Sequence, residues 1–221
     1  SFARGIDVIE GREARQVADE AEAEALEIIH PLPGGGNLAI EPTRALVAID
    51  VDIGERKGND VKRVTRAANL AALAASGRLL RLKSLGGIVV IDLVGRGHDG
   101  NALLTAARAA FSPDNPGVAI GPVGRFGTME MTIPRRAPPL AETLCDANGA
   151  LSNLTLALRL IRAIENEGAA QPGARLTATC APAVADVAKP LAEKLAAKIG
   201  ARFTIRPEPA SPRERFDVSA S

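Results

Sequence analysis

The sequence predicts an α/β fold, in which a mixed sheet with flanking helices is followed by a small second α/β domain. Two apolar runs, residues 45–50 and 87–92, each end in an aspartate, and a long segment with helical periodicity separates them. This pattern is typical of two parallel neighbouring strands joined by a helix. A stretch with three prolines then interrupts the pattern before helices and strands resume. We therefore expect a first domain at 1–133, a linker at 134–149, a small domain at 150–206 and a disordered tail at 207–221.

Each domain shows the periodicities of its expected elements. Between residues 59 and 82 apolar side chains recur every three or four positions, which predicts one amphipathic helix. Residues 37–40 and 46–50 are apolar runs separated by a turn, which predicts a hairpin. The other elements of the first domain are predicted at 12–25, 26–30, 87–92, 100–111, 118–120 and 128–133. In the small domain we expect helices at 150–167 and 182–200 and strands at 175–179 and 202–205.

Composition limits the kind of core and the kind of partner. The chain has no Trp or Tyr and only five Phe, so the core must rely on Ala, Val, Leu and Ile. A net charge of +1 makes no general case for nucleic acid, but residues 55–83 carry eight Lys or Arg against two acidic residues. A local basic stretch is expected beside a polyanion, although a solvated helix face is the plain alternative.

The expected location is cytoplasmic. Two cysteines, Cys145 and Cys180, do not make a disulfide framework and fit a reducing compartment. The start shows no signal-peptide pattern, and no apolar run approaches membrane-spanning length, so no membrane partner is expected. The abrupt start at Ser1 is compatible with a chain excised from a longer polypeptide.

Carboxylates end both strands of the predicted parallel pair. Because the two runs have equal length, we expect matched register, with Asp50 and Asp92 side by side about 4.8 Å apart. Asp52 lies two residues beyond Asp50 and should point to the same face. Two carboxylates that close repel each other unless a cation lies between them, and Mg²⁺ is typically held by one or two carboxylates with water and phosphate. The pattern therefore predicts a phosphoryl-transfer site. In the alternative, both aspartates simply end their strands and cap the helices that follow.

Several strings, in order, carry a resemblance. They are residues 34–52 (GGGNLAIEPTRALVAIDVD), 69–72 (NLAA), 78–82 (RLLRL), 85–92 (LGGIVVID) and 126–131 (FGTMEM), with 158–161 (LRLI) in the small domain. Together they make the chain, from about residue 34 to 207, similar to the ribonuclease E/G family. The resemblance implies a DNase I-like or RNase H-like catalytic subdomain and a small domain, without the family's S1 domain. It also implies endonucleolytic hydrolysis of single-stranded RNA, with Asp50 and Asp92 holding Mg²⁺ (or Mn²⁺) and with 5′-phosphate and 3′-hydroxyl products.

Two departures from the family pattern change the expectations. Asp52 stands where the family has an asparagine, and its charge can strengthen metal binding while repelling the scissile phosphate. Cys145 supplies one sulfur where the family's zinc motif has two, so no structural zinc is expected and paired subunits would form a homodimer without a zinc link. Cys180 is expected to be a small buried residue. Phe126 suits a core position and a stacking platform equally well.

We expect an Mg²⁺-dependent endoribonuclease in which Asp50, Asp52 and Asp92 are catalytic and Asp50 and Asp92 bind the metal. The expected contacts to RNA phosphates are Lys57, Arg78, Arg81 and Arg125. His30 and His98 are expected to be inert. A non-catalytic RNA-binding or assembly module that keeps the fold is the main alternative, and a metal-dependent phosphatase or deoxyribonuclease is the third.

Overall fold

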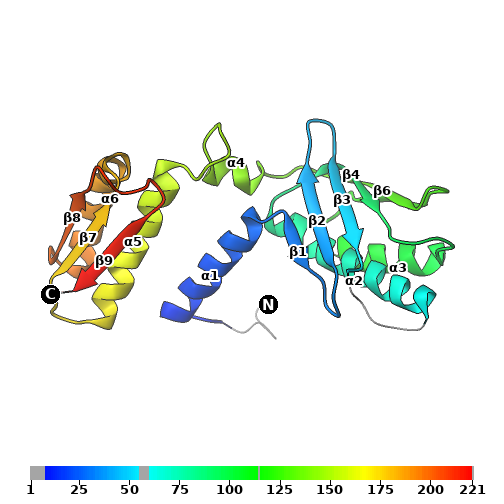
Figure 1. Ribbon diagram of the computed structural model, residues 1–221, viewed down its shortest axis with the longest axis horizontal. Coiled ribbons are helices and arrows are strands. Elements are labelled where there is room, and N and C mark those ends of the chain that lie inside the picture. Colours follow the sequence, from blue (N-terminus) through cyan, green and yellow to red (C-terminus); the bar gives the residue numbers. More distant parts are fainter. Residues whose placement is uncertain (1–7, 55–59, 114, 221) are drawn as a thin grey trace. The chain divides into compact units, whose positions relative to one another are not determined.

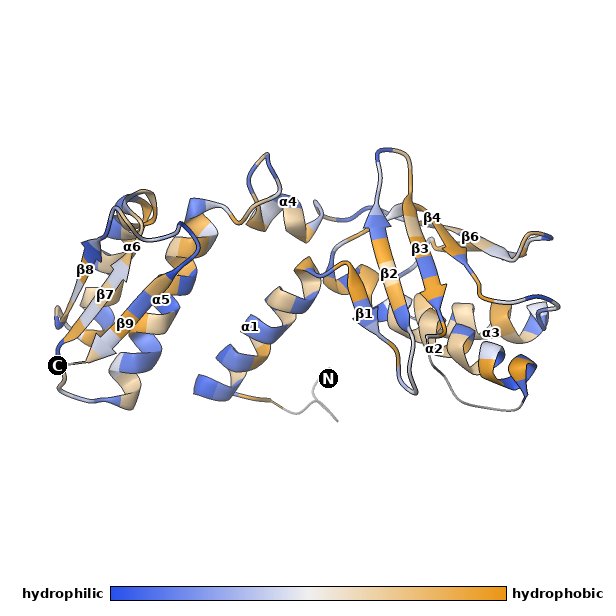
Figure 2. Cartoon of the chain, in the orientation of Figure 1, coloured by the Kyte–Doolittle hydropathy of each residue, from blue (hydrophilic) through white to orange (hydrophobic). Residues whose placement is uncertain are grey.

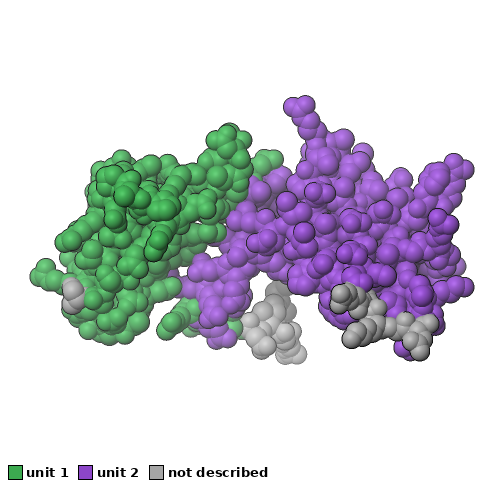
Figure 3. Space-filling view, in the orientation of Figure 1, with its two compact units in different colours: residues 1–12, 142–221 green, residues 13–141 purple. Residues whose placement is uncertain are grey.

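The computed structural model describes residues 8–54, 60–113 and 115–220. The chain divides into two compact units, residues 13–141 and residues 142–221 with 1–12 (Figure 3). The larger unit begins in α1 (Gly11–Leu26) and contains the long helices α2 (Val61–Leu82) and α3 (Gly100–Phe111). Its strands are β1 (Ile29–Pro31), β2 (Asn37–Pro42), β3 (Val47–Asp52), β4 (Gly87–Asp92), β5 (Ala119–Val123) and β6 (Thr128–Ile133).

These strands form a six-stranded sheet in the order β1-β2-β3-β4-β6-β5. The β3–β4 pair is parallel and is joined through α2, whereas every other neighbouring pair is antiparallel. The predicted hairpin is present as β2 and β3, in the register Asn37↔Asp52 to Pro42↔Val47. The mixed α/β fold predicted from the sequence is therefore confirmed (Figure 1).

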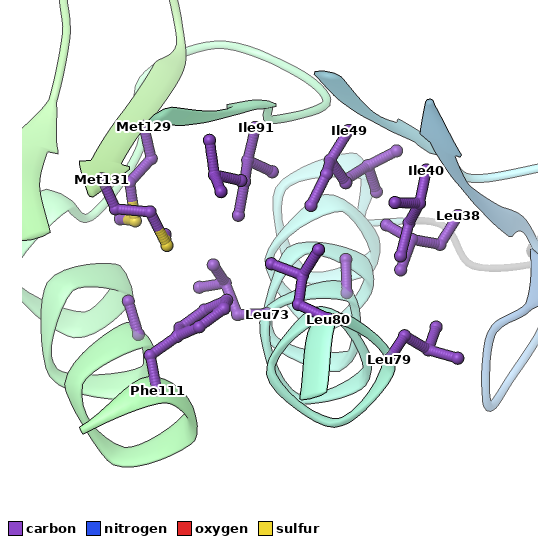
Figure 4. Packing of buried hydrophobic residues seen from close by; sticks show 14 of the residues in the cluster. Leu38, Ile40, Ile49, Leu73, Leu79, Leu80, Ile91, Phe111, Met129 and Met131 are labelled. Carbon is purple, nitrogen blue, oxygen red and sulfur yellow. The ribbon is translucent and has the colours of Figure 1, made fainter. Parts of the chain in front are cut away.

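The core lies between one face of this sheet and helices α2 and α3. Alternate strand residues such as Ile49, Ile91 and Met129 are buried and face Leu73 of α2 and Phe111 of α3 (Figure 4). Small residues allow the two helices to approach each other closely. A Cβ atom at Gly77 would lie 2.6 Å from the carbonyl oxygen of Ala110, so this position requires glycine.

The opposite sheet face presents the other alternate residues to solvent. On β3 and β4 the burial pattern leaves Asp50, Asp52, Ile88 and Asp92 exposed while their neighbours pack into the core. On β6, Glu130 is exposed on the same face because it pairs with Val90 of β4. The strands therefore combine one apolar, covered face with one polar, open face.

Helix α1 is held to this unit through its last turn. Glu24 forms a two-bond ion pair with Arg78 of α2, with one N–O distance of 2.8 Å. The ammonium of Lys83, which is buried, donates to the carbonyl of Ala25 at 2.9 Å and to that of Glu27. These carbonyls belong to the carboxyl end of α1, where lysine satisfies acceptors that the helix itself leaves unpaired. Hydrophilic residues alternate with alanines and other apolar residues along the rest of α1 (Figure 2).

The smaller unit packs helices α5 (Asn153–Ala170) and α6 (Pro182–Ile199) with a three-stranded sheet of order β8-β7-β9. Its strands are β7 (Leu176–Cys180), β8 (Phe203–Pro207) and β9 (Phe216–Ala220). The central strand β7 is parallel to β8 and antiparallel to β9. Cys180 is buried at the end of β7, as predicted, and burial raises the pKa of its thiol.

One prediction for this half of the chain was wrong. The tail from residue 207 is ordered, because Phe216, Val218 and Ala220 of β9 pack on the core while β9 pairs with β7. The stretch at 134–149, predicted as a linker, also contains a short helix, α4 (Leu140–Leu144), followed by a bridge between Cys145 and Leu151. A five-residue helix is too short to produce a detectable period. None of the helices in the described ranges is both long and apolar enough to cross a membrane.

Candidate active site

The ends of the two parallel strands bring Asp50 and Asp92 together. The register of β3 and β4 places Asp50 directly beside Asp92, as the equal lengths of the two runs predicted. Both side chains point to the open face and are exposed. Within the described residues neither carboxylate has a hydrogen bond or ion pair to another side chain. Two exposed oxygen donors side by side therefore stand at the carboxyl edge of the sheet.

Asp52 extends this acidic edge along β3. It lies on the same face as Asp50 and pairs with Asn37 of β2. Its Oδ1 accepts a hydrogen bond of 2.9 Å from the backbone N–H of Gly54, which shapes the turn after the strand. Gly36 packs against the backbone of this turn. A Cβ atom at Gly36 would lie 2.2 Å from the carbonyl oxygen of Asp52, so this close approach requires glycine. One oxygen of Asp52 is thus committed to the turn and the other is available.

The donor set fits Mg²⁺ better than Ca²⁺ or structural Zn²⁺. Mg²⁺ binds through one or two carboxylates and keeps several waters, whereas Ca²⁺ takes six to eight oxygen ligands and structural Zn²⁺ takes four protein ligands. In the part of the chain that the structure describes, no group of three or more His, Cys, Asp or Glu side chains is placed to hold a metal ion. Asp50 and Asp92 would therefore be the protein ligands, with Asp52 outside the pair.

A buried asparagine on α2 holds the segment that follows Asp92. The Nδ2 of Asn69 donates to the carbonyl of Val94 at 3.0 Å, and its Oδ1 accepts from the N–H of Val94 at 3.1 Å. The backbone N–H of Leu93 donates to the carbonyl of Gly127, so the residue just before β6 also supports this segment. The chain is thereby held on two sides immediately after the aspartate.

Positive charge gathers near this edge from three segments. Lys62 and Arg66 lie in the first two turns of α2, and Arg96 lies in the loop after β4; these three line one cavity with His98. Arg66 also has a carboxylate neighbour, since its Nη2 is 3.7 Å from Asp99.

Arg125 lies in the turn between β5 and β6, where its guanidinium stacks on Phe126 at 4.5 Å from the ring centroid. Of the predicted phosphate contacts that the structure describes, Arg125 is the one near the acidic edge.

Arg78 and Arg81 lie at the other end of the layer. Helix α2 begins after the carboxyl end of β3 and ends before the start of β4, so its last turns are ~30 Å from its first residues. Arg78 is in the ion pair with Glu24, which raises the pKa of Arg78, and Arg81 donates to the carbonyl of Ala110 at 3.0 Å. The geometry favours structural roles for both. Lys57 lies outside the described residues.

Sequence reasoning missed Arg96 and the packing of His98 in the same loop. His98 is half-buried, and its Nε2 is enclosed without a hydrogen-bond partner among the described residues. The available signal was spacing, since both follow Asp92 within six residues. Phe126, which could have been core, is 78% exposed.

A mixed sheet whose two parallel strands end in paired carboxylates defines an α/β domain with a candidate metal-binding edge. Residues 11–136 match the model of the Ribonuclease E/G family, and the chain belongs to this family. It is 34% identical over 146 residues to Ribonuclease E of Escherichia coli and, over the same length, 34% identical to Ribonuclease E of Haemophilus influenzae. These matches cover 62% of this chain and 14% and 16% of those proteins.

A longer match extends into the smaller unit. Over 208 residues the chain is 27% identical to Ribonuclease G of Escherichia coli, which covers 88% of this chain and 42% of that protein. The chain therefore spans less than half of each of these relatives. The resemblance inferred from the sequence motifs is confirmed.

Proposed function

We propose that this chain carries the catalytic site of an Mg²⁺-dependent endoribonuclease that hydrolyses single-stranded RNA. The observation that carries the proposal is the register that pairs Asp50 with Asp92 at the open edge of the sheet. Membership of a family whose curated relatives are named Ribonuclease E and Ribonuclease G supports RNA as the substrate. Mn²⁺ is a possible substitute because it accepts the same oxygen donors.

Asp50 and Asp92 hold the cation and keep it on the open face, where an extended strand of RNA can reach it. A divalent cation bound there supplies positive charge to the scissile phosphate and lowers the pKa of a water. Asp52 accepts a hydrogen bond from a water through the oxygen that Gly54 leaves available, and so orients that water. Attack of this water on phosphorus forms a P–O bond and breaks the P–O3′ bond; the O3′ oxygen leaves and takes up a proton, which gives 5′-phosphate and 3′-hydroxyl ends.

The cationic residues around the edge attract the RNA backbone. Lys62, Arg66, Arg96 and Arg125 bind phosphates without reading the sequence, so affinity should fall as salt rises. The paired arrangement of Asn69 and Val94 keeps the loop that carries Arg96 in place relative to Asp92.

The test is cleavage of an internally labelled single-stranded RNA by wild type, Asp50→Asn and Asp92→Asn, with Mg²⁺, Mn²⁺ or EDTA. Each substitution should reduce the cleavage rate by about 100-fold or more while RNA binding stays within about twofold, because loss of the cation removes several kcal/mol of transition-state stabilisation. Glu130→Gln is the matched control, since Glu130 is an exposed carboxylate on the same face of the neighbouring strand β6. It should cleave at the wild-type rate.

The outcomes separate the alternatives. Metal-dependent internal cuts whose 3′ ends can be extended by a polymerase support the proposal and its end chemistry. RNA binding without cleavage under either metal contradicts it and favours a non-catalytic RNA-binding module. Hydrolysis of small phosphate esters with intact RNA would instead identify a phosphatase, and cleavage confined to DNA would identify a deoxyribonuclease.

A further inference from the structure

A cavity of about 600 Å³ lies next to the acidic edge, between the loop after β4 and the turn that joins β5 to β6. Residues 95–98 and 100 line one side, and residues 123–127 line the other. Five of these lining residues are glycines, so the walls are mostly backbone and the space between them is open. Ligand sites for small molecules span ~300–1,000 Å³, so the cavity has room for one nucleotide.

The cavity is lined by an exposed aromatic ring, that of Phe126. Phe126 is 78% exposed, in a chain whose Phe111 is buried. The guanidinium of Arg125 lies over the ring at 4.5 Å from its centroid, and most of the Phe126 side chain stays accessible. Exposed aromatic rings beside cationic groups are platforms on which nucleobases stack.

Charge and an unsatisfied polar atom add to this platform. Arg96 and Arg125 both line the cavity, and neither has an ion pair to a described carboxylate. The Nε2 atom of His98, in the same wall, is enclosed without a hydrogen-bond partner in the described part of the chain. Buried polar atoms of proteins normally have partners, so an orphaned one marks a position where a bound group adds a hydrogen bond.

The cavity is joined directly to the carboxylate pair. Thr128 pairs with Asp92 in the sheet, and Leu93 donates to the carbonyl of Gly127. One wall therefore begins at Gly95, three residues after Asp92. The other ends at Gly127, one residue before Thr128. A nucleotide in the cavity would be a close neighbour, along an extended strand, of a phosphate held at Asp50 and Asp92.

We propose that this cavity binds one nucleotide of single-stranded RNA next to the scissile bond, with its base stacked on Phe126 and its phosphate bound by Arg96 and Arg125. The inference rests on the proposed function for the identity of the substrate. Stacking accepts every base, so the subsite adds affinity and fixes the position of the strand without selecting a sequence.

The test measures RNA binding in EDTA, so that it does not depend on hydrolysis. The 221-residue chain is titrated against labelled decauridine and against a decamer of equal charge whose bases are replaced by abasic residues. Phe126→Leu should weaken binding of decauridine about tenfold and leave binding of the abasic decamer unchanged, because only the first has bases to stack. Arg96→Gln and Arg125→Gln should weaken binding of both.

Arg44→Gln is the matched control, because Arg44 is an exposed arginine in the β2–β3 turn at the opposite end of the same strands. It should bind both decamers within about twofold of wild type. Equal weakening of both decamers by Phe126→Leu would overturn the stacking role, and unchanged binding by all three cavity variants would overturn the subsite. If these binding differences appear but no variant or wild type cleaves RNA, the subsite stands and the proposed catalysis fails.

Discussion

The side chain of Asn69 and the backbone of Val94 form two reciprocal hydrogen bonds, one to the N–H and one to the carbonyl. Asn69 is fully buried, and Val94 lies two residues beyond Asp92. The N–H and the carbonyl of Val94 need no hydrogen bond from a neighbouring strand, because the amide side chain of Asn69 satisfies both. The helix between the parallel strands thereby sets the position of the chain just after the second aspartate.

Removing this amide should destabilise the larger unit. Asn69→Ala leaves the partly buried N–H and carbonyl of Val94 unpaired, at an expected cost of about 2–4 kcal/mol in the free energy of unfolding. Urea denaturation followed by circular dichroism measures the change. Asn101→Ala, at an exposed position of α3, should change the free energy of unfolding by less than about 0.5 kcal/mol. Equal effects of the two substitutions would contradict the role assigned to Asn69.

Replacing Asp52 by asparagine should favour substrate binding. Asn keeps an oxygen that can accept from Gly54, so the turn is preserved while one negative charge beside the scissile phosphate is removed. Because exposed charges interact by about 0.2–1 kcal/mol, we expect KM for RNA to fall about twofold to fivefold. The Mg²⁺ concentration needed for half-maximal rate should rise. A higher KM for Asp52→Asn would show that the carboxylate assists binding.

Substitutions of Arg78 and Arg81 should affect stability and leave RNA cleavage unchanged. Arg78→Gln breaks the largely exposed ion pair with Glu24 and should cost less than about 1 kcal/mol. Arg81→Gln removes a hydrogen bond to Ala110 and should cost a similar amount. Unfolding and cleavage are measured on the same preparations. A large rise in KM for RNA with either variant would show that these arginines bind RNA.

Stability of the larger unit should fall when the pH drops below about 6.5, the usual pKa of histidine. Burial, with help from the nearby charge of Lys83, lowers the pKa of His30 in the folded state. The unfolded chain therefore takes up a proton first, and the contribution is complete above pH 6.5 and lost as the pH falls toward the folded pKa. The slope is at most about 1.4 kcal/mol per pH unit.

His30→Gln should remove this slope, as measured by urea denaturation at several pH values between 7.5 and 5. His98→Gln is the comparison, because it replaces the other histidine of the chain and should leave the slope in place. A slope that survives in His30→Gln would assign the pH dependence to other groups.

Deleting residues 216–221 should expose the thiol of Cys180. Phe216 of β9 pairs with Cys180 of β7, and Cys180 is 1% exposed in the folded chain. In a Cys145→Ser background, a thiol reagent should label Cys180 slowly in the full chain and rapidly after the deletion. A full-length Asp217→Asn variant, which keeps the β9 backbone, should be labelled at the slow rate. Slow labelling of the truncated chain would mean that β9 does not protect β7.

Periodicity in the sequence was sufficient for most of the larger unit. The matched register of Asp50 and Asp92 followed from two apolar runs of equal length joined by one helix, because a strand shifted by one residue would turn its apolar side chains to solvent. The helix at Gly100–Phe111 and the strand at Thr128–Ile133 were predicted with their observed bounds.

Features that depend on loops and on helix direction were not accessible in this way. The concentration of charge at residues 55–83 suggested that Arg78 and Arg81 belonged to the site, although α2 carries them to the far end of the layer. The cavity beside Phe126 is formed by two loops, and loop conformation leaves no period in the sequence. Strand β9 was missed because prolines and charged residues precede it and its alternation lasts only five residues.

The order of strands in the smaller sheet has a consequence for the chain as it leaves the ribosome. Synthesis runs from the amino end, and the six-stranded sheet is complete once Ile133 has emerged. The central strand β7, in contrast, emerges well before its partner β9. One edge of β7 therefore stays unpaired until β9 has been synthesised. An unpaired edge is open to pairing with another chain. We therefore expect nascent chains released before residue 216 to aggregate through β7 while their larger unit is already folded.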